Sequence, residues 1–347
     1  MSRRYWLVAL ALLGVGALVY LIRSELAEAF HLLNAVSLSW LLLLPLTQIS
    51  VYYARTRYYQ SFLAGLGYRV GFRKMMQLAL AALFVNQVSP TAGVSGTTLL
   101  SYGLRSHQVP AGQVTLVEYA RFILTHTSYV VLLVAAAGWM YFTSNLDQIV
   151  MRILLLIVGV GVIVDVIIIV AMTTKKQINS IVRFGQRAID WVSHWFRRNQ
   201  GPLIGVTRVN HLLDEFHQSY DAVSRDWRKL VPPLSFTLLA NLMEVMTLFI
   251  VFLALQVPIS PAQVIISYAV ANFAGAISLV PGDVGVYEVA MVAALSGTGV
   301  PVAVALSATL LYRVINKAMS LSLGFVCYTR FVQTLPVRQQ QAIKGDT

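Results

Sequence analysis

The chain has 347 residues, of which 57% are hydrophobic and only 12% are charged, and its mean hydropathy is +0.70. Soluble domains contain about 25% charged residues, so the composition excludes an ordinary soluble protein and predicts an integral membrane protein. The net charge of +12 does not indicate nucleic-acid binding, because Lys and Arg cluster in segments that alternate with nearly uncharged connections, as the positive-inside rule predicts.

Several continuously apolar runs approach the roughly 20 residues that cross a hydrocarbon core of ~30 Å as a helix, which predicts an all-α polytopic membrane protein rather than a barrel. Residues 1–35 hold the first transmembrane helix, over about 5–22, and an external connection. A signal peptide is the alternative, with a cleavage-like Ala27-Glu28-Ala29, but the apolar run is longer than the usual 7–15 residues.

Residues 36–173 form the first membrane half. A helix that begins near residue 36 is predicted to return to a cytoplasmic basic loop with Arg55, Arg57, Arg69, Arg73 and Lys74. The next apolar segment breaks at SPTAGVSG (89–96), which predicts a re-entrant hairpin near 75–106, followed by helices over about 113–142 and 150–172.

Residues 174–230 are the one sizeable polar region and carry apolar stripes at helical spacing beside Lys and Arg. This predicts a cytoplasmic basic amphipathic helical segment that lies against anionic lipid headgroups, or a simple connecting hairpin. Residues 231–330 form the second membrane half, with helices over about 233–256 and 302–328 and a re-entrant hairpin near 263–297. Residues 331–347 are a cytoplasmic tail.

The two breaks are predicted to turn back because the segments after them are too short to cross. Segments of roughly 10–15 residues span only half a bilayer as a helix. With one hairpin entering from the cytoplasm and one from outside, all charged loops agree with the positive-inside rule. The fold is therefore predicted to have about six full transmembrane helices plus two re-entrant helical hairpins, with both termini in the cytoplasm.

The two broken regions share a pattern in the same order. The features of the first are Gly93-x-x-Gly96, Val109-Pro110, Arg121 and Ser128, and those of the second are Gly282-x-x-Gly285, Val300-Pro301, Arg313 and Ser320. In segments of opposite predicted orientation, this match favours an inverted repeat of the kind common in transporters, with chance as the alternative.

The repeat suggests a site for an anion inside the membrane. Arg121 and Arg313 lie at similar predicted depths from opposite sides, and a buried arginine needs a partner or a cavity. The short helices would begin at Gly96 and Gly285, where free N–H groups and the helix dipole favour an anion. The arginine fork suits a phosphate, so these groups are predicted to bind a phosphate-bearing headgroup.

The acids near this site have two interpretations each. Asp283 is either the N-cap of the second short helix or a ligand contact, and Glu118 is either the ion-pair partner of Arg121 or a ligand contact. Glu288 pairs with Arg313 or Lys317, or contacts a cationic part of the ligand. Asp165 and Glu244 also lie in predicted helices, where they either carry protons or form hydrogen bonds to neighbouring helices. We expect His126 to be a packed polar residue.

Catalytic and cofactor motifs are absent from the sequence. It has no HExxH, no GxSxG and no GxxxxGK[ST], and its single cysteine, Cys327, excludes a disulfide framework or a cysteine metal site. We therefore expect no catalytic residues, no metal and no cofactor, and no use of ATP by the chain itself.

The motif PGDVGVYE, followed by VP and LLYR, resembles the flippase-like transmembrane domain family of lysylphosphatidylglycerol synthases. The stretch SPTAGVSG and the helix with Glu118 and Arg121 are similar to that family's earlier motif, and the resemblance covers about residues 36–330. Where the family has Gly-Gly after the proline, this chain has Gly282-Asp283. Because the chain ends soon after its last predicted helix, the resemblance implies lipid handling without aminoacyl transfer.

Together these patterns predict a membrane lipid transporter or flippase that moves a phosphate-bearing lipid, aminoacylated and polyprenyl lipids included, between leaflets. The alternatives are an integral-membrane lipid-modifying enzyme and an accessory scaffold for a cell-envelope lipid enzyme. The expected partners are a membrane phospholipid and anionic headgroups at the cytoplasmic face, and a homo-oligomer is left open. The resemblance and the charge bias favour the bacterial inner membrane.

Overall fold

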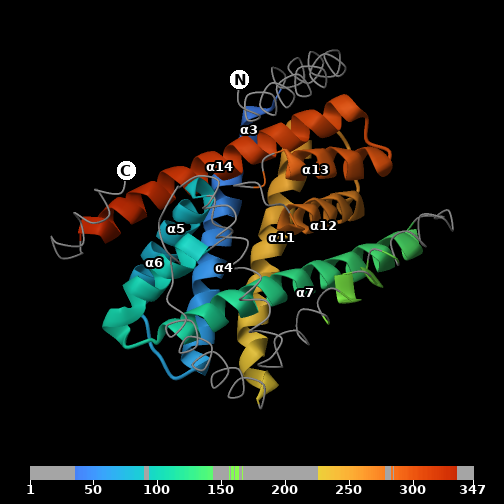
Figure 1. The fold of residues 1–347 in the computed structure, drawn as a ribbon. Coiled ribbons are helices and arrows are strands. Elements are labelled where there is room, and N and C mark those ends of the chain that lie inside the picture. The colour runs from blue at the N-terminus through green and yellow to red at the C-terminus, as the bar shows by residue number, and fades with distance from the viewer. Residues whose placement is uncertain are drawn as a thin grey trace, which may run out of the picture. The chain divides into compact units, whose positions relative to one another are not determined.

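The computed structural model describes residues 36–89, 94–143, 226–277, 283 and 285–333, with scattered helical positions between 156 and 166. The predicted helix over 5–22, most of that over 150–172, most of the basic segment and the end of the tail lie outside these residues. Throughout the described part the regular structure is helical (Figure 1). The elements are α3 (Leu38–Leu41), α4 (Leu44–Gly65), α5 (Phe72–Val88), α6 (Val94–Leu104), η1 (Arg105–His107), α7 (Ala111–Thr143), η2 (Trp227–Leu230), α11 (Val231–Ala254), α12 (Pro261–Ile277), α13 (Val286–Gly297) and α14 (Val302–Gln333).

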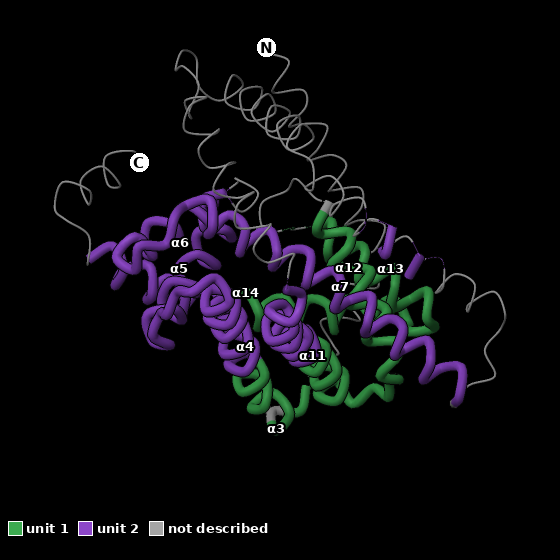
Figure 2. Tube along the Cα trace, turned by 90° about the horizontal axis from the view of Figure 1, so that it is seen from below, with its two compact units in different colours: residues 1–47, 245–278, 283–317 green, residues 48–244, 279–282, 318–347 purple. Residues whose placement is uncertain are grey.

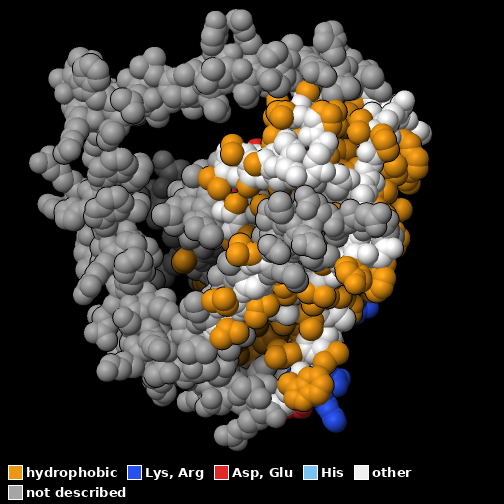
Figure 3. Space-filling model, turned by 90° about the vertical axis from the view of Figure 1, so that its right-hand side faces the viewer, with side chains coloured by type: hydrophobic (Ala, Val, Ile, Leu, Met, Phe, Trp, Pro, Cys, Tyr) orange, Lys and Arg blue, Asp and Glu red, His pale blue; other side chains and the backbone are white. Residues whose placement is uncertain are grey.

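Three described segments are long and apolar enough to cross a membrane: Ala111–Phe142, Trp227–Ala254 and Val302–Gln333. They correspond to the helices predicted over 113–142, 233–256 and 302–328. Pro232 and Pro233 lie in the first turn of α11, where a missing N–H costs nothing because those groups have no partner within the helix. On the face in Figure 3 the described surface is mostly hydrophobic side chains, as expected for helices in contact with lipid.

The chain divides into two compact units, which are described separately (Figure 2). Unit 1 comprises residues 1–47, 245–278 and 283–317, and unit 2 comprises residues 48–244, 279–282 and 318–347. Helices α4, α11 and α14 contribute residues to both units.

Unit 2 contains a hairpin of α5 and α6, which leads through η1 to the long helix α7. Its core includes Tyr58, whose buried hydroxyl donates a hydrogen bond of 2.7 Å to the Val117 carbonyl and so joins α4 to α7. Gly103 lets α6 approach α5 closely, because a Cβ there would lie 2.2 Å from Leu78 Cδ2. The hairpin predicted near 75–106 is therefore present as two packed helices.

The basic loop after the second helix is shorter than predicted. Helix α4 continues to Gly65, so Arg55 and Arg57 lie within it, and α5 begins at Phe72, so Arg73 and Lys74 lie in its first turn. The polar side chains of α4 lower its hydrophobicity but not its helix propensity, since Arg and Gln are good helix formers. This continuation places Arg55 beside the interior of unit 2 rather than in a loop.

Unit 1 contains a second hairpin, of α12 and α13. Gln263 Nε2 donates a hydrogen bond of 2.7 Å to the Thr298 carbonyl and so ties the start of α12 to the end of α13. The buried face of α13 consists of Tyr287, Met291 and Leu295, spaced at one helical turn. A short connection with Gly299 at φ +96° then leads to α14.

The two hairpins and the helices that follow them match in length. Helices α5, α6 and α7 have 17, 11 and 33 residues, and α12, α13 and α14 have 17, 12 and 32. At 1.5 Å per residue, α6 and α13 are about 16 and 18 Å long, well short of a ~30 Å hydrocarbon core. Their lengths agree with the predicted hairpins, whose depth in a bilayer and inverted orientation stay predictions.

Candidate functional site

The predicted site residues fall into two groups, one in each unit. Gly96, Glu118 and Arg121 belong to unit 2, whereas Asp283, Gly285, Glu288, Arg313 and Lys317 belong to unit 1. Gly93 and Gly282 lie outside the described residues. The predicted convergence of Arg121 with Arg313 stays a prediction, and each group is described by itself.

In unit 2, Glu118 holds Arg121 on the same face of α7. The Arg121 Nε and Nη2 atoms each lie 3.0 Å from Glu118 Oε2, the i, i+3 pairing expected as one alternative from the sequence. The other carboxylate oxygen accepts a hydrogen bond of 2.5 Å from the Tyr59 hydroxyl on α4. Both carboxylate oxygens of Glu118 accept hydrogen bonds, so the orientation of this side chain is fixed. Glu118 in turn fixes the orientation of the Arg121 guanidinium.

The first turn of α6 is capped from α5. Asn86 Oδ1 accepts a hydrogen bond of 2.8 Å from the Gly96 backbone N–H. The expectation of a free N–H at Gly96 is therefore wrong, because an amide that the sequence analysis did not consider already satisfies it. Asn86 could have been noticed as a polar residue in the apolar run before the break.

In unit 1, Glu288 makes the corresponding contacts for α13. Its Oε2 accepts a hydrogen bond of 2.6 Å from the Gly285 N–H, and its Oε1 lies 2.6 Å from Arg313 Nε. The Arg313 guanidinium also lies 4.5 Å from the centre of the Tyr287 ring, within cation–π range. The Gly285 N–H is thus not free either, and of the alternatives for Glu288 the structure shows the pair with Arg313.

Asp283 does not cap α13, because the N-cap position is Gly285. Asp283 has a left-handed backbone with φ +59°, and its side chain lies against α12, where a Cβ on Gly275 would be 3.5 Å from Asp283 Cγ. The cations that act on its carboxyl are Lys317 and Arg313. Asp283 therefore adds an acid to the charged group around Arg313.

A second ion pair in unit 2 involves Glu244 on α11, which is only 2% exposed. It accepts hydrogen bonds of 3.0 Å from Arg55 Nη2 and 3.1 Å from Gln48 Nε2, both on α4. Of the two alternatives for Glu244, the structure shows bonding between helices, whereas Asp165 lies outside the described residues. His126 is buried, bonds the Phe122 carbonyl at 2.7 Å and contacts the Phe122 ring, as expected of a packed residue.

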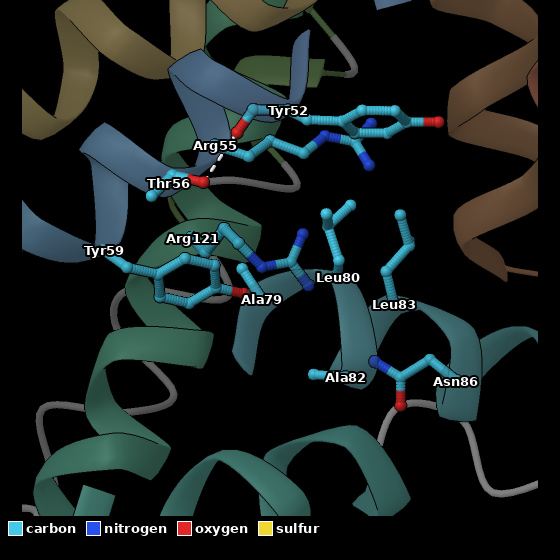
Figure 4. Close-up of a pocket in the computed structure, with 10 residues that line it drawn as sticks. All are labelled: Tyr52, Arg55, Thr56, Tyr59, Ala79, Leu80, Ala82, Leu83, Asn86 and Arg121. Carbon is cyan, nitrogen blue, oxygen red and sulfur yellow. Dashed lines mark hydrogen bonds between the residues drawn. The ribbon is translucent and has the colours of Figure 1, made fainter. Parts of the chain in front are cut away.

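A cavity of about 50 Å³ lies between α4, α5 and α7 (Figure 4). Its polar lining consists of Tyr52, Arg55, Thr56, Tyr59, Asn86 and Arg121, and its apolar lining of Ala79, Leu80, Ala82 and Leu83. The sequence analysis predicted only Arg121 of this set. Within the described part of the chain, no cluster of three or more His, Cys, Asp or Glu side chains could hold a metal ion.

Comparisons with known proteins identify relatives of the chain and its family. The relatives include UPF0104 membrane proteins of three archaea: Methanocaldococcus jannaschii (20% identity, covering 75% of each chain), Pyrococcus horikoshii (24%, 77% of this chain and 79% of the relative) and Methanothermobacter thermautotrophicus (23%, 76% of each). Since these organisms are archaeal, the expected bacterial inner membrane stays a prediction. The family described as "Lysylphosphatidylglycerol synthase TM region" matches residues 6–324, and this integral membrane protein belongs to that family.

Proposed function

We propose that this protein transports a phosphate-bearing lipid between the two leaflets of its membrane, and that Arg121 and Arg313 contact the lipid headgroup. The observation that carries the proposal is that each of these arginines lies on a long apolar helix and is held in place by a glutamate. Charged residues in membrane helices are costly, so they are retained mainly where they serve a substrate path or a partner.

The pairing with glutamate holds each arginine in position and balances its charge. A guanidinium has five N–H donors, and the contacts with Glu118 use only the Nε and Nη2 atoms of Arg121. A phosphate can therefore bind the remaining donors while the carboxylate still fixes the geometry. In unit 1, Glu288 holds Arg313 in the same way, through a close contact with Nε.

The repeated pattern supports a transporter in particular. Besides the matching helix lengths, the two serines that follow the arginines at the same interval both bond an amide of another helix. Ser128 accepts a hydrogen bond from Asn241 on α11, and Ser320 is 3.0 Å from Gln87 Nε2 on α5. Broken hairpins repeated within one chain are a common basis for moving a substrate past the membrane midplane.

The acyl chains of the lipid would stay in the bilayer while the headgroup passes through the protein. Acidic residues beside the arginines, such as Glu288 and Asp283, suit a headgroup that also carries an amine. Their charge would balance that of an ammonium group, as in an aminoacylated or other zwitterionic lipid. With no ATP-binding motif in the sequence, we propose that transport is passive or driven by protons or the membrane potential.

The test is leaflet exchange in vesicles. The purified full-length chain is reconstituted with fluorescent phosphatidylglycerol, and exchange is followed as the fraction of label that an external quencher reaches. Arg121→Ala and Arg313→Ala should each lower the exchange rate by about tenfold or more, since each removes a charge-assisted contact of about 1.5–3 kcal/mol. Arg57→Ala is the matched control, because Arg57 lies in α4 against Tyr53 and Phe72, away from both arginine–glutamate pairs.

Exchange no faster than in empty vesicles, across anionic, zwitterionic and aminoacylated lipids, would refute transport. Release or transfer of the headgroup would instead identify a lipid-modifying enzyme. Equal losses in all three arginine variants would mean that the effect comes from total charge rather than from the two sites.

A further inference from the structure

The cavity between α4, α5 and α7 is lined by hydrogen-bond donors, and no carboxylate is among its lining groups. The carboxylates of Glu118 and Glu244 do not line it, although their arginine partners do. Figure 4 shows the guanidinium groups of Arg55 and Arg121 extending into the same space above Ala79 and Leu80. With 35% and 38% of their side chains exposed, both arginines remain accessible to a ligand.

Asn86 presents its nitrogen rather than its oxygen to this space. Its Oδ1 is occupied by the Gly96 N–H, which fixes the orientation of the amide, and Figure 4 shows Nδ2 on the side of the cavity. Two other polar groups of the lining are already used: the Tyr59 hydroxyl donates to Glu118, and the Thr56 hydroxyl donates to the Tyr52 carbonyl. Asn86 therefore adds a third donor to the two guanidiniums.

Tyr52 also lines the cavity, but its hydroxyl does not face the other donors. The residue is only 5% exposed, and its hydroxyl has no hydrogen-bond partner in the described part of the protein. Figure 4 shows this hydroxyl directed away from Arg121 and Asn86, so one small ligand does not bind all of these groups.

Size and charge narrow the class of ligand. A buried water needs about 10–15 Å³ on the same scale, so a cavity of about 50 Å³ holds a few waters or one tetrahedral oxyanion in their place. Two guanidiniums and an amide N–H match the oxygens of a phosphate, which accepts several charge-assisted bonds.

We propose that this cavity binds the phosphate group of the transported lipid through Arg55, Arg121 and Asn86. The lipid as the source of the phosphate rests on the proposed function, whereas binding of a phosphate does not. Arg55 and Asn86 become ligand-binding residues in addition to Arg121.

The experiment measures binding by calorimetry on the full-length chain in a neutral detergent, with two probes: inorganic phosphate and short-chain dihexanoyl phosphatidylglycerol. Arg55→Lys keeps a cation beside Glu244 but removes the planar fork, and should weaken binding about tenfold. Asn86→Asp retains an acceptor for the Gly96 N–H but places a negative charge at the cavity, so binding should fall by about 100-fold. Arg57→Lys is the matched control, because Arg57 also lies in α4 but contacts Tyr53 and Phe72 and does not line the cavity.

Binding of the lipid probe that both variants weaken and the control does not supports the proposal, whether or not inorganic phosphate also binds. Binding of inorganic phosphate alone, with the same variant effects, supports the anion site but overturns its assignment to the lipid. Binding that neither variant weakens, or no binding of either probe, overturns the site itself. If binding holds while leaflet exchange is absent, the transport proposal fails and the site stands.

Discussion

Replacement of Gly324 by alanine should loosen unit 2, because α14 and α5 touch at this glycine. A Cβ at Gly324 would lie 2.7 Å from Phe84 Cβ and 2.9 Å from the Leu80 carbonyl oxygen. Ordinary carbon contacts are at about 3.5–4.0 Å, so the helices would have to separate by roughly 1 Å. Such overpacking costs about 1–3 kcal/mol, against a gain in helix propensity of up to about 1 kcal/mol. The expected net effect is a loss of up to about 3 kcal/mol.

Gly138→Ala on α7 is the matched control. A Cβ at Gly138 would meet no atom of another described segment within 4 Å, so this variant should keep the propensity gain and be stabilised by up to about 1 kcal/mol. Apparent melting temperatures of the two variants and the wild type, in one detergent, should rank Gly138→Ala first and Gly324→Ala last. A Gly324→Ala variant as stable as Gly138→Ala would refute the close contact between α5 and α14.

Two further substitutions test the capped N-termini of the short helices α6 and α13, and both are measured by apparent melting temperature. Glu288→Gln keeps an acceptor for the Gly285 N–H but removes the carboxylate charge that lies 2.6 Å from Arg313, and should cost about 1–3 kcal/mol. An unchanged melting temperature would show that this ion pair adds no stability. Gly96→Ala places a Cβ 2.4 Å from the Asn86 amide, so the hydrogen bond from the residue 96 N–H to Asn86 should break, at a cost of about 0.5–2 kcal/mol of stability. A variant as stable as the wild type would contradict this capping interaction.

The long helices were predictable because their signal is strong and local. The apolar run predicted as a helix over 113–142 is observed as Ala111–Thr143, and that over 302–328 as Val302–Gln333. The end of α4 was not predictable from hydrophobicity, since Arg55 and Arg57 interrupt the apolar pattern without breaking the helix. Arg55 is tolerated there because Glu244, far away in sequence, pairs with it.

The candidate site was predictable only where partners are close in sequence or share a motif. Glu118 and Arg121 are three residues apart on one helix, so their pairing followed from helical geometry. Asn86 and Arg55 were missed as site residues because their importance depends on how α4 and α5 pack, which neither spacing nor composition encodes. The same holds for Tyr59, whose bond to Glu118 joins α4 to α7.

The two hairpins differ in the residue that caps the N-terminus of the short helix, and we expect this difference to affect anion binding. Asn86 is neutral, so the positive end of the α6 dipole stays unneutralised next to a donor-rich cavity. Glu288 is an acid of α13 itself, and it neutralises both that helix end and Arg313. An anion therefore gains more from the first half than from the second. If the proposed transport holds, we expect the two halves to bind the headgroup phosphate unequally, and more tightly beside Arg121.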